Sequence, residues 1–247
     1  MSEISADFPP SRTWPAILWT VAAAIALLLA QLLGLLSFLG WQALLHPERP
    51  QALHHLATNG AAISIITFTS SLVLLLVFLG FTRIRTRDVR LYLGLRLPAL
   101  RDFMLGIAAL VLTLAAIDLV SSRFSDPRAL EFMRGMFFSA QRDHLLWLLV
   151  GAVTVAAPIG EEITFRGFLH KTIELRFGAT AAIVVTALGW SVLHIQYGLA
   201  SIASIFIIGL MLGAVRYFSR SLILTMILHG LWNSVAFLGS AMLFGKF

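Results

Sequence analysis

The chain has 247 residues, of which 59% are hydrophobic and 12% charged, and its mean hydropathy is +0.89. This balance is typical of a membrane protein and far from that of a soluble domain. The absence of cysteine excludes thiol nucleophiles, cysteine-based metal sites and disulfides, so any chemistry must use Glu, Asp, His, Arg or Ser. The net charge of +6 arises from arginines between apolar runs, which topology explains without a nucleic-acid partner.

Seven apolar runs approach or exceed the length of roughly 20 residues that a helix needs to cross a lipid bilayer. They predict an all-α, polytopic membrane helix bundle with spans at about residues 15–40, 57–81, 103–122, 144–170, 180–197, 199–216 and 221–243. No linker or composition break divides the chain. We therefore expect one membrane domain, in which residues 1–143 supply N-terminal helices and loops and residues 144–240 supply the helices of the candidate site.

The N-terminal segment is predicted to stay attached as an anchor. It carries Glu3, Asp7 and Arg12, and the apolar run that follows is longer than the ~7 to 15 residues of a signal peptide core. Six arginines between residues 83 and 101 place that connection, and with it the N-terminus, in the cytoplasm by the positive-inside rule. The sequence thus indicates a multi-pass protein of the cell membrane, with the lipid bilayer as its surroundings.

Only three acidic residues fall within the predicted spans: Asp118, Glu161 and Glu162. Asp118 lies near the end of its span, which favours an interfacial role. A charge at the centre of a span costs roughly 2.5 to 3.5 kcal/mol, so the other two and the nearby Arg166 must be paired or must meet water. Glu162 and Arg166 are four residues apart and should form an ion pair. Glu161 is rotated by ~100° and should face a cavity; a purely structural ion-pair cluster is the alternative.

Pro158 and Gly178 are expected to shape this part of the chain. Pro158 lacks an N–H group and crowds the carbonyl of Thr154, which predicts a kink just before the acidic pair, with an ordinary packing proline as the alternative. Gly178 follows a basic helical turn and is typical of a helix end. An antiparallel hairpin at Gly178 would bring Glu161 and His194 to the same level, because they are almost equally distant from it in sequence.

Two further polar sets lie within spans, in the sequences WSVLH, which ends at His194, and HGLWN, which runs from His229 to Asn233. His229 and Asn233 share one helix face. At 1.5 Å per residue, Glu161 lies ~24 Å from the outer end of its helix and His229 ~12 Å from the inner end of its own. These depths predict a shared cavity that opens to the cytoplasm. A helix-packing role is the alternative for either histidine alone.

This set of side chains suits hydrolysis of an amide bond. A carboxylate and an imidazole that face each other, here Glu161 and His194, can bind a water molecule and take its proton. His229 and Asn233 could donate hydrogen bonds to the oxyanion of a tetrahedral intermediate, at roughly 3 to 4 kcal/mol for one good donor. The chain contains neither an H-E-x-x-H zinc motif nor a G-x-S-x-G nucleophile elbow.

Three motifs in this order resemble those of the CAAX-protease and bacteriocin-processing (CPBP, Abi) family of intramembrane glutamic endopeptidases, over roughly residues 144–240. They are EEITFR with Glu161, Glu162 and Arg166, WSVLH with His194, and HGLWN with His229 and Asn233. The resemblance implies that Glu161 and His194 activate the water. It also implies that the Glu162–Arg166 pair fixes the helix and that the two HGLWN residues form the oxyanion hole.

Trp190 is a departure from the family, which usually has phenylalanine at this position, and we expect it to alter the cavity wall but not the chemistry. The family was long regarded as metalloproteases. The resemblance therefore leaves open a divalent metal such as zinc, held by Glu161, His194 and His229, although we expect a mechanism without a metal or other cofactor.

The expected substrate is a membrane-associated protein or peptide, and family members in eukaryotes cut prenylated C-terminal motifs. Two other classes of function stay open. One is a non-catalytic immunity or scaffold protein that binds a peptide in the same cavity. The other is a proton-coupled transporter that uses Glu161 and His194 as a relay, against which the lack of an internal repeat argues.

Overall fold

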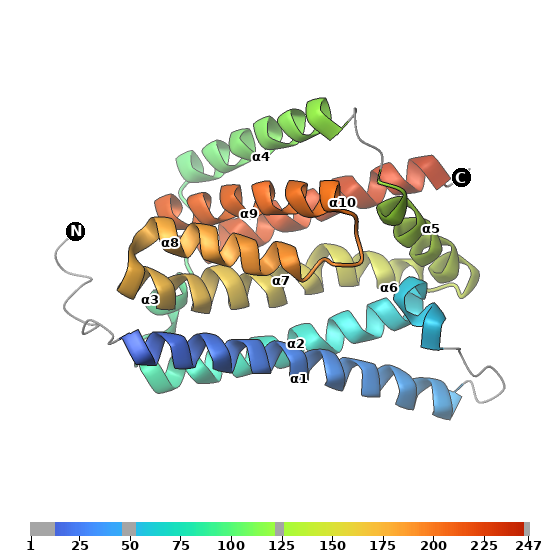
Figure 1. Cartoon of the computed structure of the whole chain (residues 1–247), viewed down its shortest axis with the longest axis horizontal. Helices are drawn as coiled ribbons and strands as arrows, with labels where there is room; N and C mark the ends of the chain where they lie inside the picture. Colours follow the sequence, from blue (N-terminus) through green and yellow to red (C-terminus); the bar gives the residue numbers. More distant parts are fainter. Residues whose placement is uncertain (1–12, 46–52, 122–125, 245–247) are drawn as a thin grey trace.

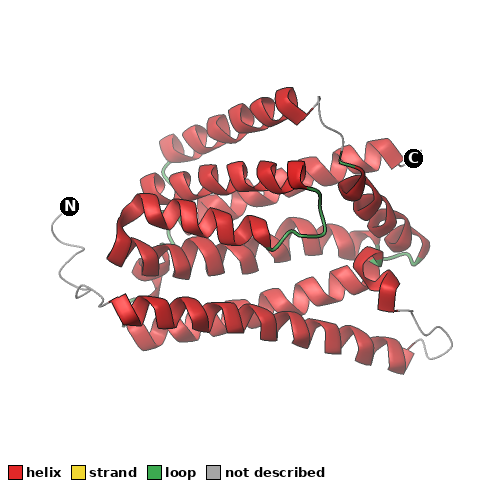
Figure 2. Ribbon diagram, viewed as in Figure 1, coloured by secondary structure: helices red, strands yellow, loops and turns green. Residues whose placement is uncertain are grey.

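The computed structural model describes residues 13–45, 53–121 and 126–244, and within these ranges every regular element is helical (Figures 1 and 2). The predicted all-α membrane bundle is confirmed. Residues 1–12, on which the anchor prediction rests, lie outside the described ranges, as do Arg49, Arg123 and Lys246. The elements are α1 (Thr13–Leu45), the 3-10 helix η1 (Leu53–Thr58), α2 (Gly60–Arg85), α3 (Val89–Leu93), α4 (Leu100–Ser121), α5 (Pro127–Arg142), α6 (Leu146–Gly151), the π-helical η2 (Ala152–Ala156), α7 (Ala157–Glu162), the π-helical η3 (Ile163–Leu169), α8 (His170–Val192), α9 (Leu199–Ser219) and α10 (Leu222–Phe244).

Six helical stretches of the described chain are long and apolar enough to cross a membrane, whereas seven spans were predicted. The difference lies in Leu146–Val192, a stretch of 47 residues that contains the fourth and fifth predicted spans. Gly178 interrupts it with φ 82° and ψ 171°, a backbone region that is essentially restricted to glycine. The chain reverses there (Figure 1), so the predicted hairpin is confirmed and its two arms account for the seventh span.

The helices pack around a large apolar core that includes Phe78 of α2, Phe168 of η3, Trp190 of α8 and Leu212 of α9. In Figure 1, α1 and α2 form one edge of the bundle and α4 lies at the opposite edge, against α9 and α10. The α8 and α9 helices approach closely because Gly209 has no side chain: a Cβ atom there would lie 3.0 Å from the Cβ of Ala187. This packing sets the second arm of the hairpin firmly in the bundle.

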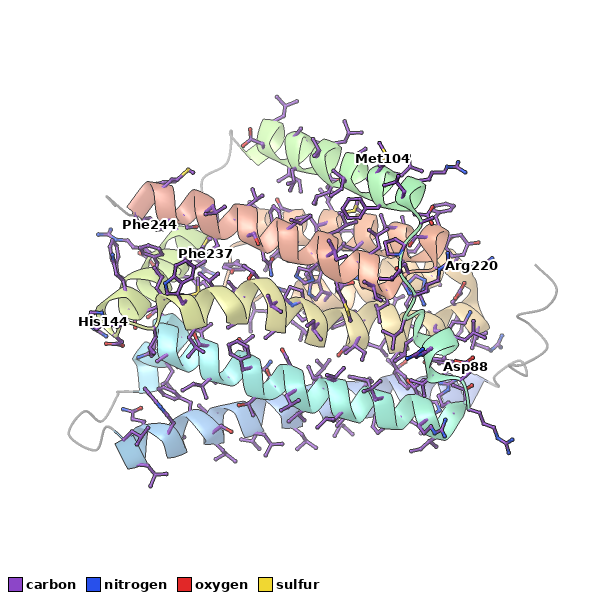
Figure 3. The ribbon with its side chains drawn as sticks, turned by 180° about the vertical axis from the view of Figure 1, so that it is seen from behind. Asp88, Met104, His144, Arg220, Phe237 and Phe244 are labelled. Carbon is purple, nitrogen blue, oxygen red and sulfur yellow. The ribbon has the colours of Figure 1, made fainter. Side chains whose placement is uncertain are left out.

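The two ends of the bundle differ in chemistry. One end carries α3 and the arginine-rich connection, and the other carries α5; Figure 3 shows Asp88 and Arg220 at the first end and His144 and Phe244 at the second. The sequence did not predict α5, since it is too short and too polar to cross a bilayer. It is amphipathic, and its apolar face is buried at residues such as Phe137.

Candidate functional site

The helix that carries the acidic pair is not a regular α-helix. The π-helical segments η2 and η3 lie on either side of α7, which contains Pro158, Glu161 and Glu162. The backbone dihedral angles of Ala156 and Ala157 remain helical. The break in regularity that Pro158 predicts therefore takes the form of a widened turn and not of a non-helical kink, a type of irregularity that is frequent at functional sites.

The widened turn leaves the carbonyl oxygen of Val153 without its usual backbone donors. The N–H of Ala157, its α-helical donor, bonds to the oxygen of Ala152 instead. The donor one residue further on would be Pro158, which has no N–H group. The side chain of Asn233 on α10 supplies a donor in their place: its Nδ2 donates to the Val153 oxygen at 2.7 Å. The amide of Asn233 is thus held against the helix that carries the acidic pair.

Glu162 and Arg166 form the predicted ion pair, and neither side chain is exposed. Nη1 of Arg166 lies 2.8 Å from Oε1 of Glu162, and Nη2 donates to the carbonyl oxygen of Gly209 at 3.3 Å. Nδ1 of His229 lies 3.0 Å from the same Oε1. Because a carboxylate oxygen accepts, Nδ1 of His229 carries a proton. Glu162, in α7, therefore connects η3 and α10 through its contacts with Arg166 and His229.

Glu161 lies at the wall of a cavity, as predicted, and its side chain is 29% exposed. Its Oε2 accepts a hydrogen bond from Nε1 of Trp190 and lies 3.9 Å from Nε2 of His229. Trp190 was expected to alter only the cavity wall. The structure shows that its indole also bonds directly to the carboxylate at the centre of the candidate site.

His194 does not lie within a helix, which corrects the predicted span of residues 180–197. The α8 helix ends at Val192, and the N–H groups of Leu193 and His194 bond to carbonyls three residues back. The turn that follows lies partway along the length of the bundle (Figure 2), and its residue Ile195 is exposed. Nδ1 of His194 is 2.9 Å from the carbonyl oxygen of Trp190, which can only accept. In the neutral imidazole the proton is therefore on Nδ1, and Nε2 keeps a lone pair.

Tyr197 belongs to the same turn and was not identified from the sequence. Its ring stacks on that of His194, with centroids 6.0 Å apart, and it lines the cavity. Burial raises the pKa of the Tyr197 phenol to about 12, so the hydroxyl stays protonated at neutral pH. Tyr197 is therefore a neutral polar group beside His194.

Asp126 fixes this turn and was also missed. Its Oδ2 accepts from the N–H of Gly198 at 3.0 Å, while its Oδ1 accepts from Ala129 at 3.2 Å and caps α5. Burial alone would raise the pKa of this carboxyl. Hydrogen bonds from Ser201 and from these backbone N–H groups outweigh that effect and lower the pKa. One carboxylate thus ties α5 to the turn that carries His194.

A cavity of about 430 Å³ brings most of the predicted site together. Four of the six predicted residues line it: Glu161, His194, His229 and Asn233. The remainder of the wall is mainly apolar and comes from the near ends of α2, α4, α5 and α10, as with Ile63, Ile117, Phe132, Met136 and Phe237. The four site residues therefore line a largely apolar chamber that has a small number of polar groups, as is usual for ligand sites.

The cavity has a defined direction within the bundle. From Glu161 it extends toward α5, which lies at the end of the bundle opposite the arginine-rich connection. If the arginine-rich connection is cytoplasmic, as predicted, the cavity extends from Glu161 toward the opposite side of the membrane. Glu161 lies about midway along the helical stretch that ends at Gly178, and the opening to the cytoplasm stays a prediction.

The three residues proposed as alternative metal ligands, Glu161, His194 and His229, are not arranged around a common point in this structure. In the part of the chain that the structure describes, no group of three or more His, Asp or Glu side chains is arranged to hold a metal ion. Glu161 is bonded to Trp190, and His194 directs Nδ1 toward a carbonyl oxygen.

Residues 143–235 match the family model described as type II CAAX prenyl endopeptidase Rce1-like. This segment, 93 of the 247 residues, is similar to that family. The match contains all six predicted site residues, so the expected resemblance is confirmed, and it leaves α1 to α5 outside. Comparisons with curated proteins and with solved structures gave no match. The Rce1-like segment points to a protease of the CAAX type that acts within the membrane.

Proposed function

We propose that the protein is an intramembrane endopeptidase that hydrolyses a peptide bond of a membrane-associated protein or peptide, with a water molecule activated by Glu161 and His194. The observation that carries this proposal is that a carboxylate, two imidazoles and an amide from three separate segments line one cavity inside the helix bundle. The similarity of residues 143–235 to the Rce1-like family model supports the same class of reaction.

Two groups are suited to take the proton of the water. Trp190 and His229 both approach Oε2 of Glu161, which leaves Oε1 to meet a water molecule. Nε2 of His194 has a lone pair, because Nδ1 donates to the Trp190 carbonyl. One of these bases accepts a proton as the water oxygen bonds to the carbonyl carbon of the substrate. The same proton passes to the leaving amine when the C–N bond breaks.

The oxyanion of the intermediate requires donors on the other side of the carbonyl group. Asn233 uses one Nδ2 hydrogen on Val153, and the second is directed elsewhere by the planar amide. His229 donates from Nδ1 to Glu162, so it can donate from Nε2 only when it carries both protons. With both protons, His229 would be a cation. Its charge and that of Arg166 would then balance the negative charges of Glu161 and Glu162. Removing one such donor typically costs 10²–10³-fold in kcat, or roughly 3 to 4 kcal/mol.

The apolar part of the cavity suits a substrate that reaches the site from the membrane. Its walls of Ile63, Ile117, Phe132, Met136 and Phe237 offer little to a hydrated peptide but can hold apolar side chains next to the scissile bond. Residues that hydrolyse the bond and residues that hold the substrate are thus separated along the cavity.

Purified protein in detergent should cleave at least one member of a library of membrane-proximal peptides. The variants Glu161→Gln and His194→Asn are expected to lower kcat by about 10²–10⁴-fold. Glu174→Gln and His144→Asn are matched controls on partly exposed or exposed side chains and should cleave normally. Undiminished cleavage by both site variants would overturn the proposal. Peptide binding without any cleavage by the wild-type protein would instead favour the scaffold alternative.

The same assay addresses the metal question. Cleavage is expected to persist after exhaustive treatment with a chelator, since the proposed mechanism uses only side chains and water. Loss of cleavage on chelation, with recovery on adding zinc, would contradict this part of the proposal.

A further inference from the structure

Trp190 occupies the centre of the candidate site without belonging to the water-activating pair or the oxyanion hole. Its side chain is large and only 1% exposed. Its ring centroid lies 5.3 Å from that of His194 and 5.0 Å from that of His229. The guanidinium of Arg166 lies over the same ring, 4.5 Å from the centroid. One aromatic side chain thus contacts residues from each segment of the site.

The indole is also fixed in place. On one face it meets Arg166, and on α9 it packs close to Gly209, where an added Cβ would lie 3.2 Å from Cε3 of the indole. Nε1 can only donate, so it requires an acceptor, and Oε2 of Glu161 supplies it. Glu161, by contrast, is partly exposed and has a flexible side chain with several torsions. The rigid partner therefore sets the orientation of the flexible one.

We infer that Trp190 is a positioning residue, whose indole N–H holds Oε2 of Glu161 so that Oε1 faces the water in the cavity. This inference rests on the proposed function, because it assigns a role in the same reaction. The role requires the indole itself, because a phenylalanine ring would fill much of the space but has no N–H to donate. Glu161 is then oriented before the substrate arrives, which avoids reorganisation during the reaction.

Trp190→Phe tests the role of the N–H, because it keeps an aromatic ring against Arg166 and the two histidines. We expect a fall in kcat of about 10–100-fold, the usual cost of losing a hydrogen bond that orients a reactive group, with KM changed by less than about 2-fold. Trp147→Phe is the matched control, since Trp147 is 85% exposed and lies outside the site, and it should keep the wild-type kcat.

A spectroscopic measurement separates positioning from simple packing. The protein has six tryptophans, so ¹⁵N-labelled indole groups should give a small set of resonances, and Trp190→Phe assigns the one of interest. We expect its proton to resonate downfield, as in a charge-assisted hydrogen bond, and to move upfield in Glu161→Ala but not in Glu174→Ala.

The outcomes distinguish this inference from the proposed function. A Trp190→Phe enzyme with wild-type kcat overturns the positioning role, whatever the resonance shows, and so does an indole resonance that ignores Glu161→Ala. Either result leaves the proposed function intact, provided that Glu161→Gln abolishes cleavage. Failure of the wild-type protein to cleave any peptide overturns both.

Discussion

Replacing Glu162 by glutamine removes the negative charge that compensates Arg166 in a region where neither side chain is exposed. At a separation of 2.8 Å, the attraction between the two charges is about 6 kcal/mol for an effective dielectric constant of ~20. Desolvation of both ions offsets much of this attraction in the native protein. In the variant, Arg166 is still buried away from water, so its desolvation cost remains, but the attraction to the charge of Glu162 is lost. We therefore expect the free energy of unfolding to fall by about 3–5 kcal/mol.

An SDS titration of the protein in mixed micelles, followed by circular dichroism, would measure this loss. The matched control is Glu174→Gln, which breaks the pair with Lys171 only a few residues further along the chain. That pair has a similar separation, 3.1 Å, but its side chains are 26% and 17% exposed. Water and flexibility should limit the control to about 0.2–1 kcal/mol.

A further variant separates the loss of the pair from the isolation of one charge. Glu162→Leu combined with Arg166→Met removes both buried ions, so we expect it to be more stable than Glu162→Gln alone. Equal losses for Glu162→Gln and Glu174→Gln would refute the reasoning, because they would show that burial does not govern the cost of removing one partner.

Three further predictions concern α10, α5 and the orientation of the bundle. Gly230→Ala would place a Cβ 2.7 Å from a carbonyl oxygen of η2, so it should destabilise the protein by about 1–3 kcal/mol in the SDS titration, whereas Gly239→Ala, with nothing within 4 Å, should not. Asp126→Asn should lower stability at pH 7; because the pKa of Asp126 is lowered in the folded state, its contribution is lost as pH falls, and the difference from wild type should shrink as the Asp126 carboxyl becomes protonated. In this cysteine-free chain, Ala99→Cys and Gln141→Cys lie at opposite ends, and the positive-inside rule predicts that an impermeant maleimide labels only the second in intact cells; the reverse result would place the cavity on the cytoplasmic side.

Local spacing was sufficient to predict part of the site. The Glu162–Arg166 pair follows from a separation of four residues on a helix, and the pairing survives even though η3 is π-helical. The hairpin follows from Gly178, because its backbone conformation excludes most other residues. In each case the interaction or the conformation depends on residues close together in the chain.

The parts that could not be predicted depend on contacts between distant segments. The bond from Trp190 to Glu161 joins residues 29 positions apart and requires the rotation of both hairpin arms to be known. Asp126 and Gly198 are 72 positions apart, and Asp126 reads in the sequence only as a residue suited to cap a helix. The side to which the cavity opens stays a prediction for a related reason, since a depth estimate from one helix end says nothing about where that end lies in the bilayer.

The irregular helix explains how these distant contacts converge on the acidic pair. In η2 the carbonyl oxygen of Val153 does not accept its usual α-helical hydrogen bond from Ala157. Nδ2 of Asn233 on α10 donates to this oxygen instead. In η3 the N–H of His170 bonds to the oxygen of Phe165, and Nε of Arg216 on α9 donates to the oxygen of Arg166 at 3.0 Å.

Each widened turn thus offers a carbonyl oxygen that a neighbouring helix binds, one before and one after Glu161. A regular α-helix would use both oxygens internally, so these two bonds to neighbouring helices would be lost. Because neighbouring helices donate hydrogen bonds to both oxygens, the rotation of this helix about its own axis is fixed. That rotation decides which way Glu161 and Glu162 point. This is the reason that one acidic residue can face the cavity while its neighbour stays in the buried ion pair.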